Sequence, residues 1–262
     1  MPADSVRKTF FVAFSLCLVC SFLVSGASVM LHPRQELNKA LDIKKNLLMA
    51  TGLIKKAGAS KDEIDHLFSM VEPIVIDLAT GETAPEIIPE TFDPQKAARD
   101  PSSQYVIPQN KDLARIKVRA RHALIYLIKN DGKVSQLVLP VHGKGLYSTL
   151  YGFLALASDT KTVTGFAFYD QGETPGLGGE VDNPKWKAQW PGKVIYDDLW
   201  QPAIRLVKGG VNPTAPNSIH QVDAISGATM TSRGVQNLLL YWLGENGYGP
   251  FLQKFRENGG HV

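Results

Sequence analysis

An uncharged apolar run near the N-terminus limits the folds open to this chain more than any other feature. From Thr9 to Leu31 the sequence TFFVAFSLCLVCSFLVSGASVML contains no Asp, Glu, Lys or Arg. A helix of about 20 apolar residues crosses the hydrocarbon core of a bilayer. We therefore expect a single transmembrane helix over residues 10–31.

The flanks of this run predict its orientation. Arg7 and Lys8 stand immediately before it, and basic residues favour the cytoplasmic side of a membrane. We expect a cytoplasmic tail over 1–9 and export of everything after Leu31. The alternative is a cleaved signal peptide with Ser25-Gly26-Ala27 as its cleavage site, although the apolar run continues past that site.

Composition excludes several classes of function. The 262 residues are 44% hydrophobic with a formal charge of +3, which suits one globular domain with attachments. No Lys/Arg run is interleaved with aromatic residues, so we expect no nucleic-acid partner. Both cysteines, Cys17 and Cys20, lie in the apolar run. A disulfide, a thiolate zinc site or a cysteine-ligated cluster is therefore not expected in the exported part, and we expect no metal site.

Residues 32–110 are expected to form an N-terminal exported helical segment and a linker. Leucines near helical spacing predict a helix over 35–58. Ser60 and Glu63 match a capping box that opens a short helix, which Pro73 is expected to close. A strand follows over 74–78. Five prolines between 83 and 110 indicate a long linker.

Residues 111–262 are expected to form the main domain. Consecutive strands favour an α+β fold on a mainly antiparallel sheet with packed helices. Asn130-Asp131-Gly132 predicts a hairpin turn. We expect helices at 183–191, after Thr231 and after Pro250, and strands over 123–128, 134–141, 150–157, 162–169 and 203–207.

Three glycine-rich loops have no recognised nucleotide-binding spacing. They cover 142–147, 173–179 and 208–210, and none matches the Walker or dinucleotide-binding pattern. They are either turns at strand ends or loops whose amides approach a ligand closely. His142 is expected at the surface or in a turn. No histidine has an evident serine or carboxylate partner, so we expect no catalytic side chain.

The stretch DAISGATMTSRGVQ, residues 223–236, has four hydroxyl side chains just before the apolar run LLLYWL. A helix N-terminus offers unpaired amides and a positive dipole end, which makes it a natural phosphate site. The alternative is simple capping of the helix by Ser or Thr, which needs only one hydroxyl.

Residues 223–231 resemble the flavinylation signature of the FMN-binding domain family, in which FMN is joined through its phosphate to a threonine. The pattern is Asp, two spacers, Ser/Thr-Gly-Ala-Thr, one spacer and Thr, and every specified position matches. The run Glu173-Thr174-Pro175-Gly176-Leu177-Gly178 matches a second motif of the family. With 169–172, 249–251, the anchor and the linker, essentially the whole chain is similar to the family of C-type subunits of sodium-translocating NADH:quinone oxidoreductases.

The resemblance implies a set of site residues. FMN would be esterified to Thr231, with Thr229 as the runner-up. Asp223 would serve a separate flavin transferase. A lysine at 208 would stabilise the reduced flavin, or it is simply a surface lysine. The expected cofactor contacts are Ser226, Gly227, Ala228 and Thr229 around the phosphate, Glu173, Thr174, Gly176, Leu177 and Gly178 at the ring, and Gly145, Leu146, Tyr147 and Lys208.

The resemblance also implies a function. The chain would relay electrons, one at a time, from a single-pass anchor in a bacterial inner membrane, with its domain on the periplasmic side. Its partners would be subunits of the B, D, E and F types, the flavin transferase and membrane lipid, in a reaction from NADH to ubiquinone coupled to sodium export. Two alternatives stay open: an FMN carrier like the G-type subunit of RNF electron-transport complexes, and a non-redox exported interaction module.

Overall fold

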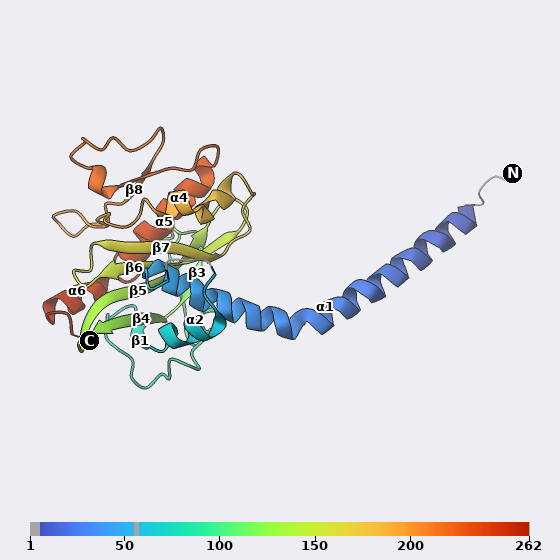
Figure 1. The fold of residues 1–262 in the computed structure, drawn as a ribbon, viewed down its shortest axis with the longest axis horizontal. Helices are drawn as coiled ribbons and strands as arrows, with labels where there is room; N and C mark the ends of the chain where they lie inside the picture. The colour runs from blue at the N-terminus through green and yellow to red at the C-terminus, as the bar shows by residue number, and fades with distance from the viewer. Residues whose placement is uncertain (1–5, 55–57, 262) are drawn as a thin grey trace. The chain divides into compact units, whose positions relative to one another are not determined.

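The computed structural model describes residues 6–54 and 58–261, and Figure 1 traces them from blue to red. The chain divides into two units, Met1–Ile43 and Lys44–Val262. Of the expected cytoplasmic tail, residues 1–5 lie outside the described part.

A single long helix, α1 (Val6–Ala50), contains the apolar run. It is long and apolar enough to cross a membrane, a property that a signal sequence near an N-terminus shares. The separate helix expected over 35–58 is the continuation of α1 and ends earlier, at Ala50. Gly52 explains this end, because its φ of +75° is left-handed. Residues 55–57 of the expected helix lie outside the described residues.

Helix α2 (Lys61–Phe68) begins where the capping box predicts. The Ser60 hydroxyl accepts a hydrogen bond from the Glu63 amide at 3.2 Å. Pro73 does not close this helix, which ends at Phe68. Pro73 lies instead in strand β1 (Val71–Asp77), at the edge of the sheet, where a residue without an N–H is tolerated.

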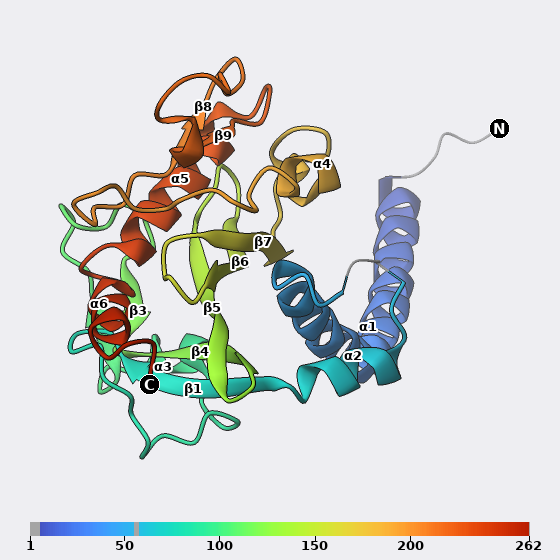
Figure 2. The same ribbon diagram turned by 60° about the vertical axis from the view of Figure 1, so that its left-hand side comes forward.

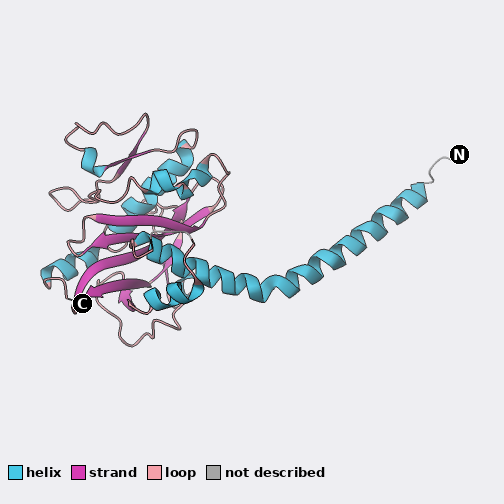
Figure 3. Cartoon of the chain, viewed as in Figure 1, coloured by secondary structure: helices cyan, strands magenta, loops and turns pink. Residues whose placement is uncertain are grey.

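Five antiparallel strands form the main sheet (Figure 3), in the order β1-β4-β5-β6-β7. The expected meander is confirmed. A two-residue turn joins the first hairpin, with Asp131 and Gly132 at φ of 51° and 77°. The four meander strands are β4 (His122–Asn130), β5 (Lys133–Lys144), β6 (Thr149–Ala157) and β7 (Val163–Asp170).

The proline-rich segment over 83–110 lies inside one compact unit. Strand β1 precedes it and pairs with β4 after it, so the segment loops out of the sheet and returns. It contains the short helix α3 (Pro94–Ala97) and strand β2 (Gln104–Val106), which pairs with β3 (Val118–Ala120). The prolines and the lack of periodicity over 83–110 indicated a linker. That local pattern gives no information about the pairing of β1 with β4, which joins residues far apart in the sequence.

The C-terminal part adds a second small sheet and the packed helices. Asn183 caps α4 (Pro184–Lys187), and α5 (Thr229–Leu243) and α6 (Gly249–Glu257) follow. Strand β8 (Arg205–Val207) pairs in parallel with β9 (Gln221–Asp223). The sequence analysis missed β9, because three residues are too few to show alternation. Two short 3-10 helices lie between these elements: Gly178–Asp182 precedes α4, and Ser218–His220 precedes β9.

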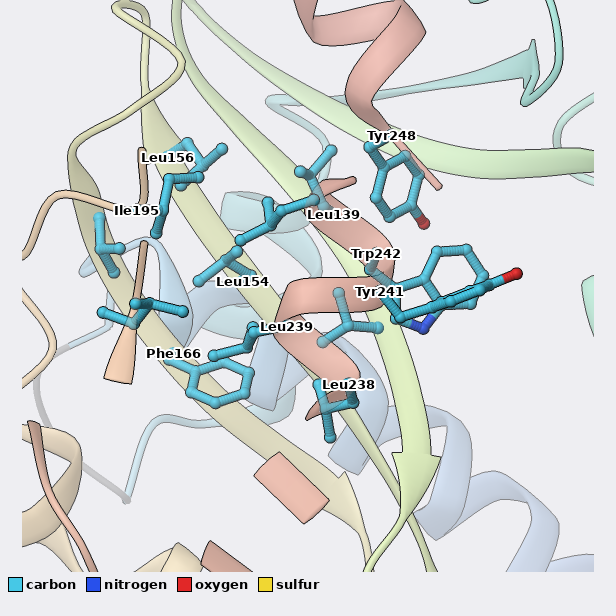
Figure 4. Packing of buried hydrophobic residues seen from close by; sticks show 14 of the residues in the cluster. Leu139, Leu154, Leu156, Phe166, Ile195, Leu238, Leu239, Tyr241, Trp242 and Tyr248 are labelled. Carbon is cyan, nitrogen blue, oxygen red and sulfur yellow. The ribbon is translucent and has the colours of Figure 1, made fainter. Parts of the chain in front are cut away.

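Helix α5 packs on one face of the sheet and builds the core (Figure 4). Leu238 and Leu239 meet Leu139, Leu154 and Phe166 from three neighbouring strands, and all five are buried. The apolar run LLLYWL is therefore core, as expected.

Two aromatic residues of the core, Trp242 and Tyr248, have hydrogen-bonded polar atoms, whereas the buried Trp190 indole nitrogen has no partner among the described residues. The Trp242 indole donates to the His142 carbonyl at 2.7 Å, and the Tyr248 hydroxyl donates to the Pro140 carbonyl at 2.6 Å, so burial leaves these donors satisfied. We expected His142 at the surface or in a turn, but it is half-buried and lies within a strand. It lies in β5 between the rings of Tyr151 and Trp242, and burial lowers its pKa to about 4.

The end of α1 covers the other face of the sheet, opposite α5 (Figure 2). Leu47 and Leu48 are completely buried there, and the Gln136 side chain donates to the Thr51 carbonyl at 3.2 Å. A Cβ on Gly165 in β7 would overlap the carbonyl oxygen of Ala50. Because both faces are covered, the middle strands are almost continuously apolar.

Replacing Gly165 with alanine is expected to destabilise this contact. Overpacking of this kind costs about 1–3 kcal/mol, which lowers the melting temperature by roughly 3–10 °C for a domain of this size. Gly58→Ala is the matched control, because a Cβ at Gly58 meets nothing within 4 Å. Thermal unfolding followed by circular dichroism in detergent measures both. Equal melting of Gly165→Ala and wild type would contradict the packing described.

Candidate functional site

Three connections of the main unit come together at the first turn of α5. They are the turn between β5 and β6, the loop after β7, and the segment from β9 into α5. Each contains one of the regions singled out in the sequence. Hydrogen bonds from backbone amides and from a side-chain hydroxyl to one side-chain carboxylate join them.

Thr231 and Glu173 form the central contact. Thr231 is the third residue of α5, and its hydroxyl donates to the Glu173 carboxylate at 2.6 Å across 58 residues of chain. The two residues are only 1% and 5% exposed. A hydrogen bond to an ionised carboxylate at this distance is among the stronger ones in proteins.

The same carboxylate binds the turn between β5 and β6. It accepts from the amides of Leu146, Tyr147 and Ser148 at 3.1, 3.0 and 2.9 Å, and from the Ser148 hydroxyl at 3.1 Å. Burial alone would raise the pKa of Glu173. The bonds from Thr231 and the three amides outweigh burial and hold its pKa below the usual range.

Glycines leave the space that this arrangement needs. A Cβ on Gly145 would lie 2.7 Å from Glu173 Oε1, and one on Gly178 would lie 2.6 Å from Thr231 Oγ1. A Cβ on Gly234, inside α5, would lie 2.5 Å from the Lys144 carbonyl. Side chains at these positions would push the loops and the helix apart.

A cavity of about 600 Å³ adjoins the start of α5. It includes Lys208, Ser226 and Thr229 of the expected site, but Thr231 is not among its lining residues. Leu177 connects the cavity with the Thr231–Glu173 contact. It belongs to the loop that carries Glu173, and a Cβ on the cavity residue Gly227 would lie 3.1 Å from the Leu177 Cδ2 atom. The lining residues are Leu206, Lys208, Gly209, Gly210, Asp223, Ala224, Ile225, Ser226, Gly227, Thr229, Ser232, Arg233 and Gln236.

Asp223 forms part of the cavity wall. Its carboxylate accepts from the Val211 amide at 2.6 Å, and its own amide donates to the Gln189 side chain at 3.0 Å. The first bond attaches the loop that carries Lys208 to strand β9, and the second attaches the segment after α4 to the same strand. Asp223 therefore has a structural role in addition to the transferase recognition that the resemblance implies.

The four hydroxyls do not cap α5. Ala228 occupies the N-cap position without a side-chain hydrogen bond, and α5 begins at Thr229, earlier than expected. The Ser232 hydroxyl accepts from the Ile225 amide at 2.9 Å, which closes the preceding turn. Ser226 and Thr229 are exposed. Helix capping therefore does not account for the hydroxyls.

The expected contacts fall into two groups. Gly145, Leu146, Tyr147, Glu173, Gly178 and Thr231 gather around the carboxylate, whereas Ser226, Gly227, Thr229, Lys208 and Asp223 line the cavity. Thr174 and Gly176 shape the loop between them: the Thr174 carbonyl accepts from the Leu177 amide at 3.1 Å, and Gly176 has a φ of +76°. Ala228 is buried at the N-cap.

The sequence analysis missed Ser148, Arg233 and Gly234. Ser148 donates twice to Glu173, and Arg233 lines the cavity with Lys208. A glycine inside an apolar helix was the available signal for Gly234. A second cavity of about 750 Å³ lies beside Trp200 and Arg256 and contains none of the expected site residues.

Comparison with known proteins identifies relatives over nearly the whole chain. Residues 145–244 match the FMN-binding domain. The C-type subunit of the Na(+)-translocating NADH-quinone reductase of Pseudomonas aeruginosa is 48% identical over 255 residues, covering 97% of each chain. The C-type subunit of the same reductase from Yersinia pestis is 45% identical, covering 97% of this chain and 94% of the relative.

Two solved structures are similar to this one. The crystal structure of Shewanella oneidensis NqrC has a TM-score of 0.76 and 38% identity, and covers 84% of this chain and 99% of that chain. The C-type subunit of the Na(+)-translocating NADH-quinone reductase from Parabacteroides distasonis has a TM-score of 0.65 and 27% identity, and covers 85% and 96%.

The buried Glu173 carboxylate predicts a pH-dependent stability. Its pKa is lower in the folded chain than in the unfolded chain, where a glutamate titrates near pH 4.3. The stability it contributes is therefore fully present above about pH 4.3 and is lost as pH falls through the folded-state pKa. The destabilisation of Glu173→Gln should be large at pH 7 and shrink in acid. Urea unfolding of the full chain in detergent at several pH values measures it, and a destabilisation independent of pH would contradict this assignment.

Proposed function

Because this chain belongs to the family of C-type subunits of Na(+)-translocating NADH-quinone reductase, we propose that it carries FMN on Thr231 and relays electrons within such a complex. One observation carries the proposal. The last threonine of the flavinylation signature and the glutamate of the second motif meet in a 2.6 Å hydrogen bond beside a cavity at a helix N-terminus.

The residues present fit a flavin nucleotide. The first-turn amides of α5 have no partner within the helix and favour an anion. The adjoining cavity of about 600 Å³ is within the range of cofactor sites. Lys208 and Arg233 supply positive charge at its wall. FMN, when bound, supplies the one-electron chemistry, and the chain holds and orients it.

Two observations bear on the choice between Thr231 and Thr229. Thr229 is exposed and faces the cavity, which keeps it as the runner-up. Thr231 occupies the signature's last position, and a carboxylate orients its hydroxyl in the way that nucleophilic hydroxyls are activated. We assign the phosphoester to Thr231. Attachment then requires the Glu173 loop to open, because the hydroxyl is buried.

The remaining expected contacts have distinct parts in this proposal. Ser226 to Ala228 form the turn near the phosphate, and Thr174 and Leu177 meet the ring. Glu173, Gly176 and Gly178 place that loop, and Gly145 to Tyr147, whose Leu146 and Tyr147 amides bind the Glu173 carboxylate, are further flavin contacts. Lys208 stands at the cavity wall, where its charge would favour the reduced flavin.

We propose that α1 is a retained anchor in the bacterial inner membrane with the domain on the periplasmic side, because its apolar run is long enough to span a bilayer and Arg7 and Lys8 precede it. A covalent tether prevents loss of FMN in that compartment. We propose that a flavin transferase loads the chain, recognising Asp223, and that subunits of the B, D, E and F types exchange electrons with it. NADH binds elsewhere, because the sequence has no dinucleotide fingerprint.

The comparisons favour this function over both alternatives. Relatives that carry the name of the C type cover 97% of the chain, which favours that type over an RNF-type carrier. The match to an FMN-binding domain favours a flavoprotein over a non-redox interaction module.

Intact mass tests the attachment. The full chain produced with its flavin transferase should gain one FMN. Because the Thr231 hydroxyl and the phosphate join with the loss of one water, that gain is the mass of FMN less one water. It should disappear in Thr231→Ala and persist in Thr229→Ala, because only Thr231 would provide the accepting oxygen. Loss in Thr229→Ala alone would move the site to the runner-up. No gain in the wild-type chain would remove the proposed function.

The reduction potential of the loaded chain tests Lys208. Replacing Lys208 with glutamine should lower the potential by roughly 60 mV or less, equivalent to about 1.4 kcal/mol for one electron, because a positive charge near the ring favours reduction. Lys185→Gln removes an exposed lysine that does not line the cavity and should leave the potential unchanged. Equal potentials in the Lys208 variant and wild type would make Lys208 a surface lysine.

A further inference from the structure

Glu173 is a buried anion that is held entirely by hydrogen-bond donors. Three consecutive backbone amides, one serine hydroxyl and the Thr231 hydroxyl point at its carboxylate. Among residues 6–54 and 58–261, no Lys, Arg or His forms an ion pair with it. Such a set of donors, with consecutive amides turned inward, is an anion-binding nest.

The phosphate attachment proposed above changes this nest. Once Thr231 Oγ1 carries a phosphoester, it has no proton left to donate to Glu173. An ionised phosphate oxygen also stands next to Oγ1. In the structure Glu173 Oε2 lies 2.6 Å from Oγ1, about as close as two oxygens of one phosphate group lie. A carboxylate and a phosphate cannot both occupy that place, because two buried like charges repel strongly.

We propose that Glu173 occupies the phosphate-binding nest of the unloaded chain, and that the amides of Leu146, Tyr147 and Ser148 bind the phosphate on Thr231 after loading. Glu173 leaves the nest in that exchange. The inference rests on the proposed attachment to Thr231 and deepens it. It assigns the phosphate contacts to a turn that the sequence motifs do not include.

The glycines around the nest support this exchange. Any Cβ at Gly145 or Gly178 would enter the space of the carboxylate or of Thr231 Oγ1, so bare backbone surrounds the bound anion. The loop that carries Glu173 is attached to the nest by the Gly172 amide, which donates to the Ser148 hydroxyl at 2.8 Å. Ser148 therefore contacts both the anion and the loop that must move.

A thermodynamic cycle tests the exchange. The full chain is purified in detergent with and without FMN on Thr231, as wild type and as Glu173→Gln. In the unloaded chain the substitution should lower the melting temperature by roughly 4 °C or more, because the donors lose their anion. In the loaded chain the loss should be less than half as large, because the phosphate satisfies the donors. Equal losses in both states would mean that Glu173 stays in place and would overturn the proposal.

Ser148→Ala is the matched control for this cycle. Ser148 donates to Glu173 in the unloaded chain and would donate to the phosphate in the loaded chain. Its removal should therefore lower the melting temperature by a similar amount in both states. A state-dependent loss in Glu173→Gln together with a state-independent loss in Ser148→Ala is the expected pattern.

Inorganic phosphate tests the nest without any FMN. In the unloaded Glu173→Ala chain the vacated donors should bind added phosphate, so the melting temperature rises with phosphate concentration against chloride at equal ionic strength. Wild type should not respond. The same response in wild type and variant, or none in the variant, overturns the nest as a phosphate site. Glu173→Gln replaces the alanine variant if that variant does not fold.

The two proposals fail separately. If intact mass shows no FMN on Thr231, the proposed attachment site is wrong, whatever the melting temperatures are. A chain that gains FMN on Thr231 but shows equal Glu173→Gln losses in both states keeps the proposed function and removes only the exchange.

Discussion

The hydrogen bond between Thr231 and Glu173 unites the parts of this site that lie far apart in sequence. One carboxylate joins the first turn of α5 to the turn between β5 and β6. Its charge is buried, which is costly unless donors surround it. Here five donors do so, and their bonds hold the pKa of Glu173 below its usual range. The interaction therefore holds the two turns together and also places an anionic charge where a phosphate is proposed to bind.

The hydrogen bond between Thr231 and Glu173 depends on how closely α5 approaches the sheet. Leu238 and Leu239 bury the helix against β5, β6 and β7. Two glycines permit the contact: a Cβ on Gly143 would lie 2.5 Å from the Leu238 Cβ, and one on Gly234 would meet the Lys144 carbonyl. The packing of the apolar face therefore sets the position of the polar first turn, and a rigid helix is a more precise support for a ligand than a loop.

Local patterns predicted the elements well where one short segment contains the whole signal. The capping box at Ser60, the Asp131-Gly132 turn and the meander strands need only neighbouring residues, and the structure confirms them. The misjudged features depend on distant partners. His142 is held between Tyr151 and Trp242, Pro73 lies in an edge strand paired with β4, and β9 exists through its pairing with β8.

The sequence by itself determined the apolar anchor run, the antiparallel α+β domain, the family and the two motifs of the site. It did so because hydropathy, alternation and motif spacing are properties of contiguous residues. Only the tertiary structure decided that Ser148 and Glu173 share one hydrogen-bond network with Thr231, and that Thr229 faces a cavity while Thr231 is buried. Those relations depend on how the sheet and α5 pack, and packing brings together residues that no local pattern connects.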